Sequence, residues 1–381
     1  MTNRPKPKKS AKQQVTVVGA GYAGLLAALR LAPHAQVTLI DPSDRFTERV
    51  RLHERAAHPR EVTHPLRDLL CGTGVRHLPR RATTLDPIAR LVTTDDGQHL
   101  AYDRLVYALG SRTALANPTT DRTAGTADER VYTAESTDRL RQRMRDGTGS
   151  VAVVGGGLTG IELAAELAEA HPRWTVRLLS AGPVAAGHSA RGRAHVLAVL
   201  TALGVQVDEG HRIADPAAVD ADAVVWAASM VPNTSLAADA GLPLDPRTGR
   251  ITVDDTLRSI AHPEIYAVGD AAAAHSPLAG PMRMGCAAAL PTGAAAATSI
   301  IAETRGQAPK PLSFGYVIQC VSLGRHDGLI QLVRPDDTPR DRILTGRRAA
   351  FIKERVVRST VLTLRLARRH PTAIPFLPGL G

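Results

Sequence analysis

Six glycines in two equally spaced triplets could bind the phosphates of two nucleotides. Each triplet has the pattern G-x-G-x-x-G, and the two sets are Gly19, Gly21 and Gly24, and Gly155, Gly157 and Gly160. In such a loop the first glycine makes a tight turn and the second lets the backbone approach a pyrophosphate. The third lets a helix pack closely on a strand. The free N–H groups at the helix N-terminus then bind the phosphate oxygens.

The segments around these glycines predict the elements that must position them. Residues 15–32 and 151–168 match at nine of eighteen positions, and the two motifs lie 136 residues apart. In each segment a β-branched run enters the glycine turn and continues into an alanine- and leucine-rich stretch. This order predicts a strand, a phosphate loop and a helix. We therefore expect an α/β protein with two Rossmann-like domains that bind two dinucleotides.

The residue that follows the second strand of each unit is expected to face the adenosine ribose. In the first unit this is Asp41, whose carboxylate can accept hydrogen bonds from ribose hydroxyls. In the second unit it is Ser180, close to Arg177. A hydroxyl beside an arginine would tolerate a 2′-phosphate, which favours NADPH over NADH. The alternative is that Arg177 points elsewhere, because side chains alternate along a strand.

Charge is concentrated at the two ends of the chain. The 381 residues carry a formal net charge of +11; residues 1–13 carry +5 and residues 347–381 carry +7, so the body between them is close to −1. With 3% aromatic residues, this body does not suggest a nucleic-acid groove. We find no apolar run of about 18 residues and no secretory signal, and expect a cytoplasmic protein.

Three cysteines are widely spaced. Cys71, Cys286 and Cys320 form no C-x-x-C or C-x-x-x-x-C pair, so neither a local redox disulfide nor a cysteine metal site is expected. We predict no metal. A pair that meets only in the folded chain stays open.

Composition shifts divide the chain into five segments. We expect a disordered basic arm, then a first dinucleotide domain in two parts that enclose the second domain, and a C-terminal segment. The predicted bounds are 1–13 for the arm, 14–112 and 237–307 for the first domain, 113–236 for the second, and 308–381 for the C-terminal segment.

These motifs in this order resemble the pyridine nucleotide-disulfide oxidoreductase superfamily over about residues 14–330. GGGLTGIELAAELA, the closing strands and the absence of a redox cysteine pair look most like type II NADH dehydrogenases and apoptosis-inducing-factor-like oxidoreductases. The resemblance implies FAD in the first unit and NADPH or NADH in the second. It also implies that the segment EIYAVGDAA returns to the first domain.

The resemblance further implies a set of cofactor contacts. Asp270 would lie at the flavin ribityl chain and pyrophosphate, and Glu162 would orient the nicotinamide near the flavin, as the candidate catalytic residue. Arg49, with Arg51 as the alternate, would cover the FAD phosphates. We expect Glu166 to be structural. His53 could lie near the flavin, but a single histidine among polar residues is more often a surface group. The remaining cofactor contacts expected are Ala108, Gly110 and Gly269.

Two C-terminal stretches bear on the electron acceptor and on localisation. At 282–300, quinone-reducing relatives carry glutamines beside the flavin, but here residues 287–291 are apolar. An apolar wall could still accept a quinone ring or another planar substrate, but the departure puts a respiratory role in doubt. Residues 347–370 predict a basic amphipathic helix, with Ile352, Val357 and Leu364 opposite Arg358 and Arg365. This helix could lie on the cytoplasmic face of a membrane or pack on the last strands.

The sequence thus predicts a FAD-dependent NAD(P)H dehydrogenase that passes electrons to a small planar acceptor such as a quinone. One alternative is an NAD(P)H-dependent ferredoxin or rubredoxin reductase. Another is a redox-sensing flavoprotein that binds a partner through its basic ends. The sequence leaves the oligomeric state, monomer or homodimer, open.

Overall fold

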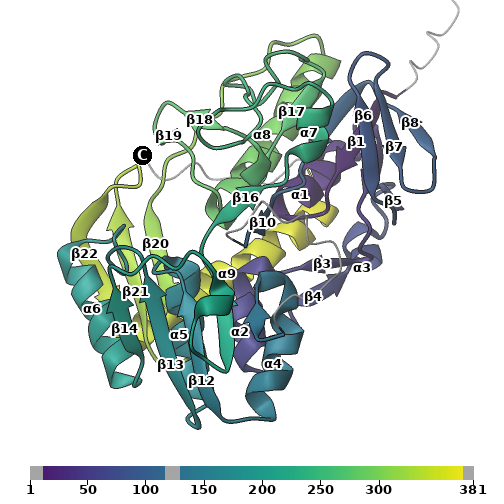
Figure 1. The fold of residues 1–381 in the computed structure, drawn as a ribbon. Coiled ribbons are helices and arrows are strands. Elements are labelled where there is room, and N and C mark those ends of the chain that lie inside the picture. Colours follow the sequence, from purple (N-terminus) through teal and green to yellow (C-terminus); the bar gives the residue numbers. More distant parts are fainter. Residues whose placement is uncertain (1–11, 116–128, 372–381) are drawn as a thin grey trace, which may run out of the picture.

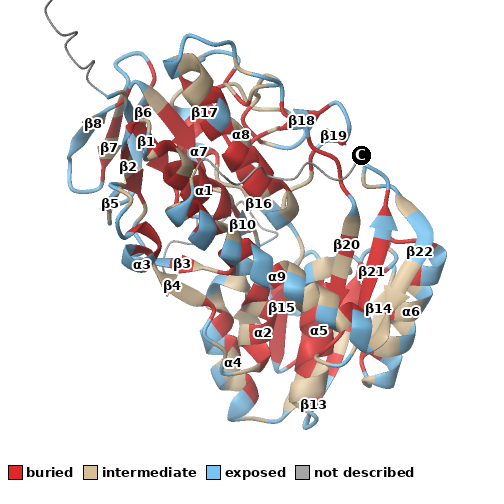
Figure 2. Cartoon of the chain, turned by 180° about the vertical axis from the view of Figure 1, so that it is seen from behind, coloured by how far each residue is buried: buried red, intermediate tan, exposed pale blue. Residues whose placement is uncertain are grey.

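Two lobes, each built on a parallel sheet, make up the protein (Figure 1). The computed structural model describes residues 12–115 and 129–371. Most of the predicted basic arm, most of the predicted loop at 113–128 and the last ten residues lie outside these ranges. Each lobe has its own buried core (Figure 2).

The first sheet has five parallel strands in the order β17-β9-β1-β2-β5. Its strands are β1 (Gln14–Val18), β2 (Gln36–Ile40), β5 (Arg76–Leu78), β9 (Arg104–Tyr107) and β17 (Ile265–Ala267). Because β17 pairs with β9, the chain returns to this sheet after passing through the second lobe.

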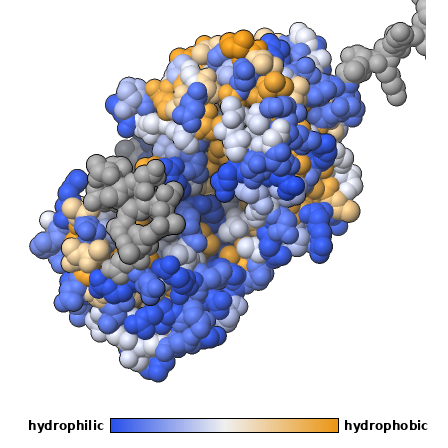
Figure 3. Space-filling model, turned by 45° about the vertical axis from the view of Figure 1, so that its right-hand side comes forward, coloured by the Kyte–Doolittle hydropathy of each residue, from blue (hydrophilic) through white to orange (hydrophobic). Residues whose placement is uncertain are grey.

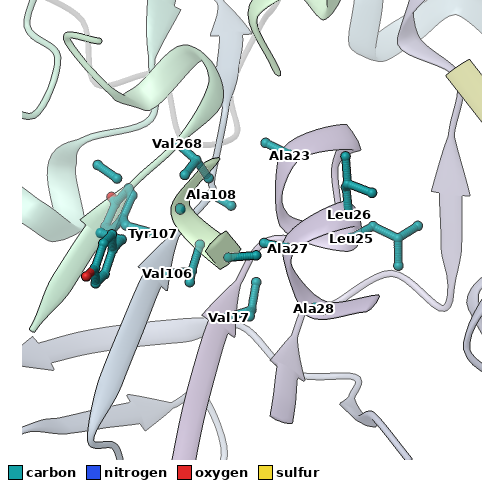
Figure 4. Close-up of a cluster of buried hydrophobic side chains, with 14 of the residues drawn as sticks. Val17, Ala23, Leu25, Leu26, Ala27, Ala28, Val106, Tyr107, Ala108 and Val268 are labelled. Atoms are coloured by element: carbon teal, nitrogen blue, oxygen red, sulfur yellow. The ribbon is translucent and has the colours of Figure 1, made fainter. Parts of the chain in front are cut away.

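Helix α1 (Tyr22–Leu31) connects β1 to β2 and is almost entirely buried. It packs against β1, β9 and the turn after β17 through small and aliphatic side chains (Figure 4). It also packs on α8 (Cys286–Thr304). The contact needs a glycine, because a Cβ on Gly293 would lie 2.3 Å from the carbonyl oxygen of Ala23.

The second sheet repeats this arrangement in the order β11-β15-β12-β13-β14. Its strands are β11 (Val131–Tyr132), β12 (Gly149–Val154), β13 (Trp174–Ser180), β14 (Gln206–Glu209) and β15 (Ala223–Trp226). Its helices are α4 (Thr137–Arg145), α5 (Leu158–Ala170) and α6 (Ala190–Ala202). The sequence suggested one closing strand over DAVVWAASMVPN, but the segment forms two: β15 ends at Trp226, and β16 (Met230–Pro232) pairs with β10 (Ser111–Thr113).

Short elements complete the two lobes and the junction between them. They are β3 (Arg45–Thr47), β4 (Thr63–Pro65), β6 (Ala82–Asp86), β7 (Leu91–Thr94), β8 (His99–Ala101), β18 (His275–Ser276), β19 (Gly280–Pro281), α2 (Leu52–Ala57), α3 (Leu66–Leu70) and α7 (Ser235–Asp239), with short 3₁₀ turns at 49–51, 134–136, 216–218 and 269–271.

The C-terminal segment forms an antiparallel sheet and a long helix between the lobes. The strands are β20 (Ile318–Ser322), β21 (Gly328–Val333) and β22 (Pro339–Thr345), and the helix is α9 (Gly346–Arg369). Figure 1 shows α9, in yellow, running between the two lobes, and it contacts both α1 and the C-terminal strands. The predicted amphipathic helix is therefore present, and its apolar side is used inside the protein.

Among the described helices, one is long and apolar enough to cross a membrane by length and composition alone. It is α8, so the expectation that no apolar run reaches about 18 residues was wrong for this segment, and 56% of its apolar window is buried inside the protein. This burial and its contact with α1 are what a core helix shows.

Candidate active site between two dinucleotide-binding loops

The first glycine loop has the geometry of a phosphate cradle. Gly19 has a φ of +105°, and a Cβ there would lie 2.4 Å from the carbonyl oxygen of Ala108. A Cβ on Gly24 would lie 2.0 Å from the oxygen of Gly19, whereas a Cβ on Gly21 would meet nothing within 4 Å. Gly21 also begins α1 without a side-chain cap, so the helix N-terminus is open to an anion.

The close packing at Gly24 gives a direct prediction for FAD loading. We expect Gly24→Ala to purify with little or no flavin absorbance, because the added methyl group must push apart the turn and the helix that form the cradle. Gly187→Ala is a matched control, since a Cβ there has no neighbour within 4 Å. A Gly24→Ala protein with wild-type yellow colour would contradict this assignment.

Asp41 stands beside this loop, as the sequence predicted. Its carboxylate accepts hydrogen bonds from the backbone N–H groups of Ala20, at 2.7 Å, and Ser43, at 2.9 Å. His77 contacts the Asp41 carbonyl oxygen at 3.1 Å and lines an adjoining pocket of about 380 Å³. A carboxylate at the end of β2 with a pocket next to it suits the ribose and adenine of a dinucleotide.

The second loop has the same construction. Cβ atoms on Gly155 and Gly160 would lie 2.9 and 1.8 Å from backbone atoms, while a Cβ on Gly157 would be unobstructed. Ser180 is the counterpart of Asp41, because Val154 pairs with Leu179 as Val18 pairs with Ile40. Arg177 is not the partner that the sequence suggested for Ser180, since its guanidinium donates to the carbonyl of Asp220 at 3.3 Å.

Asp270 ties together three segments of the first lobe. Its carboxylate accepts from Ser111 Oγ at 2.6 Å and from the N–H of Gly285, the residue before α8, at 2.7 Å. Gly269 and Gly110 both adopt positive φ, at +63° and +64°. The Gly-Asp turn therefore lies next to the N-terminus of α8, where the resemblance expects the flavin.

Glu162, the candidate catalytic residue, lies in a buried cluster at the junction of the lobes. One carboxylate oxygen is 2.8 Å from Lys353 Nζ of α9 and accepts from the N–H of Ser322 at 3.0 Å. The other lies 3.7 Å from His53 Nδ1. Lys353 also donates to the carbonyl of Cys320 at 3.1 Å. Three distant parts of the chain thus meet at one carboxylate.

The charges in this cluster are stabilised by each other. Burial would raise the pKa of Glu162, but Lys353 lowers it, and Glu162 in turn raises the pKa of Lys353 against the effect of burial. Burial lowers the pKa of His53. At neutral pH the cluster therefore holds a carboxylate, an ammonium group and a neutral imidazole.

The sequence expectation for His53 was wrong, and the one for Glu166 agrees with its surroundings. His53 is buried because α2 packs on α5, and its Nε2 has no hydrogen-bond partner within the described residues. Glu166 is fully buried and contacts Arg325, Ser322 and His58, which is a structural arrangement.

Arg49 and Arg51, proposed for the FAD phosphates, both bind carboxylates of the protein. Arg49 lies 3.5 Å from Glu135 and is exposed, so its role at the phosphates stays a prediction. Arg51 is buried among Glu48, Glu54 and Glu354, with the shortest nitrogen–oxygen distances between 2.8 and 3.1 Å. Arg51 therefore connects α2 to α9 through ion pairs, and its guanidinium is occupied by these carboxylates.

Sequence reasoning missed Lys353 and the partners of Arg51. Lys353 is 191 positions from Glu162, and no local motif connects the two. One signal was available: Lys353 is the single lysine in α9, where every other basic residue is an arginine.

Two phosphate cradles on two parallel sheets, with an ionised cluster between them, define a two-dinucleotide oxidoreductase. Residues 13–289 match the pyridine nucleotide-disulphide oxidoreductase family. The chain belongs to this family, whose members use FAD and NAD(P)H, and it is a FAD-dependent NAD(P)H oxidoreductase.

Similar proteins agree with this assignment. An NADH dehydrogenase-like protein of Mycobacterium tuberculosis is 31% identical over 82% of this chain and 86% of its own length. An alternative NAD(P)H-ubiquinone oxidoreductase of Arabidopsis thaliana is 28% identical over 84% of this chain and 73% of its own length. A probable ferredoxin reductase of Castellaniella defragrans is 31% identical over 79% of this chain and 78% of its own length. The solved structure of NDH2 from Plasmodium falciparum with NADH superposes with a TM-score of 0.75 at 15% identity, covering 94% and 97% of the two chains.

Proposed function

We propose that this enzyme oxidises NAD(P)H and passes the electrons through FAD to a quinone. The observation that carries the proposal is the buried Lys353–Glu162 pair between the two cradles. FAD would supply the two-electron chemistry, and the protein must position the nicotinamide and exclude water. The ammonium group of Lys353, held in a low-dielectric site, would stabilise negative charge that develops on a reduced ring.

The start of α8 provides an acceptor surface of the right chemistry. In its first two turns Ala287 and Ala289 are partly exposed, whereas Ala288, Leu290 and Pro291 are buried. Apolar side chains next to one buried cation suit a planar, weakly polar ring. The Arabidopsis relative, named as a ubiquinone oxidoreductase, supports the same class of acceptor.

Anaerobic titration followed by turnover tests the proposal. We expect yellow protein whose flavin absorbance is bleached by NADH or NADPH and is restored by menadione. Steady-state reduction of menadione should need no added protein. Turnover that appears only with a ferredoxin or rubredoxin would replace the quinone by a protein acceptor, and colourless protein after reconstitution with FAD would overturn the proposal.

We also propose that the protein is cytoplasmic and that the outer side of α9 touches an anionic membrane. Leu362 and Leu366 are 54% and 41% exposed and lie close to Arg365 and Arg369. These residues line a surface pocket of about 370 Å³ against α3. Apolar side chains flanked by arginines suit a lipid interface. Figure 3 shows one face of the molecule, much of which is hydrophilic.

Co-sedimentation with vesicles tests this contact. We expect Arg365→Glu/Arg369→Glu to lower binding to phosphatidylglycerol vesicles at least about tenfold, because each basic residue near an anionic surface contributes about 1 kcal/mol. Arg212→Glu/Arg247→Glu changes the same charge at exposed positions in other parts of the surface. Equal binding by the two double variants would remove α9 from this role.

A further inference from the structure

A second ion pair lies at the edge of the sheet where the NAD(P)H adenosine is expected. Glu209 ends β14 and is the register partner of Ser180. Its carboxylate accepts two hydrogen bonds from Arg193 of α6, both at 2.7 Å. Because the carboxyl ends of parallel strands lie at one edge, Glu209 is beside Ser180, one strand further out.

This pair also fixes the loop that follows β13. Glu209 accepts from the N–H of Val184 at 2.6 Å, and Arg193 Nε donates to the carbonyl of the same residue at 3.1 Å. The next N–H, that of Ala185, donates to the oxygen of Gly156 in the phosphate loop at 3.0 Å. The loop is thereby held against the glycine turn.

As a result, Ser180 is buried, whereas the side chains of Arg193 and Glu209 are partly exposed. Ser180 is 6% exposed, while the side chains of Arg193 and Glu209 are 34% and 33% exposed. Arg193 and Glu209 are therefore partly exposed charged groups at the edge where an adenosine ribose is expected. A free carboxylate here would bind the 2′-hydroxyl of NADH and repel the 2′-phosphate of NADPH.

We propose that Arg193 and Glu209 set the nucleotide preference of this enzyme and admit the 2′-phosphate of NADPH. Arg193 neutralises Glu209, and within the described residues its Nη1 has no hydrogen-bond partner. A guanidinium that has one terminal nitrogen on a carboxylate and the other unpaired can donate a hydrogen bond from the unpaired nitrogen to a phosphate oxygen. This inference rests on the proposed use of NAD(P)H at the second loop and names the residues that choose between its two forms.

Two substitutions at the pair should change the preference in opposite directions. Arg193→Gln leaves Glu209 unneutralised, so kcat/KM for NADPH should fall at least tenfold while that for NADH changes less than threefold. Glu209→Gln leaves the guanidinium without its carboxylate, so NADPH use should rise relative to NADH. A pair that only holds the loop would weaken both nucleotides in both variants, and that result would overturn the proposal.

A binding measurement separates this proposal from the overall function. Calorimetry with adenosine 2′,5′-bisphosphate and with 5′-AMP needs no turnover, and Arg193→Gln should weaken the bisphosphate selectively. Arg191→Gln, which removes the same charge from an exposed position two residues earlier, should leave the ratio of the two dissociation constants unchanged. An equal loss in both variants would show a general charge effect and refute the pair. If neither nucleotide bleaches the flavin, the proposed function fails while this ratio can still be measured.

Discussion

Replacing Arg51 by methionine should lower the free energy of unfolding by about 3–5 kcal/mol, the usual cost of removing one partner from a buried ionic cluster. Methionine keeps most of the side-chain volume but leaves Glu48, Glu54 and Glu354 without their shared cation. Part of this charge stays compensated, because Arg60 lies close to both Glu54 and Glu354. The midpoint of urea unfolding, followed by circular dichroism, measures the loss.

Arg358→Met is the matched control for Arg51→Met. Arg358 also binds Glu354, but its side chain is 62% exposed, so its removal should cost less than about 1 kcal/mol. Comparable losses in the two variants would show that burial does not set the strength of this cluster. A loss below 1 kcal/mol for Arg51→Met would show that the cluster does not hold α9 in place.

The same cluster predicts an acid-sensitive part of the stability. Burial alone would raise the pKa of Glu354, but hydrogen bonds from Arg51 and Arg358 lower it to about 2, below the ordinary value of 4.5. A depressed carboxyl pKa contributes stability above the unfolded-state pKa, and this contribution is lost as the pH falls from 4.5 towards 2. Arg51→Met should therefore lose less stability than the wild type over this pH range.

Local motifs explain why both nucleotide sites could be predicted and the junction between them could not. Gly19 and Gly155 act within a few residues of their own strand and helix, so their spacing carries the geometry of the turn. The positions of Asp41 and Ser180 after their strands could be predicted from the same short-range order of elements. By contrast, Arg51 and Glu354 are 303 positions apart, and their contact exists only because α9 passes between the lobes.

The amphipathic pattern of α9 shows what periodicity can and cannot decide. It predicted a helix with one apolar side, and Val357, Val361 and Leu364 are indeed buried. It could not say that this side packs on α1 and α3 within the protein, because an apolar stripe is the same whether a membrane or a core covers it. His53 failed for a related reason: its polar neighbours suggested solvent, but they pair with one another inside the protein.

Replacing Lys353 by methionine should lower kcat for quinone reduction about 100-fold, the usual effect of removing one preorganised charge from an enclosed site. Without the ammonium group, burial raises the pKa of Glu162, so protonation of its carboxylate moves to higher pH. Flavin reduction in this variant should therefore recover as the pH rises. The rate of flavin reduction in the wild type should not depend on pH over the same range, because Lys353 holds the pKa of Glu162 below its ordinary value.

Three further variants separate this electrostatic role from a loss of folding. Lys353→Arg keeps the charge and should restore the flat pH profile, while Arg355→Met, at an exposed position on the same helix, should leave both rate and profile unchanged. If Lys353→Met is too unstable to purify, Glu162→Gln/Lys353→Met removes both charges and should fold, because no unpaired ion is left buried. That double variant should bind FAD but show no pH-dependent recovery. A Lys353→Met enzyme with wild-type kcat and no acid limb would mean that Glu162 needs no cation, and that the junction of the lobes acts only as a support for α9.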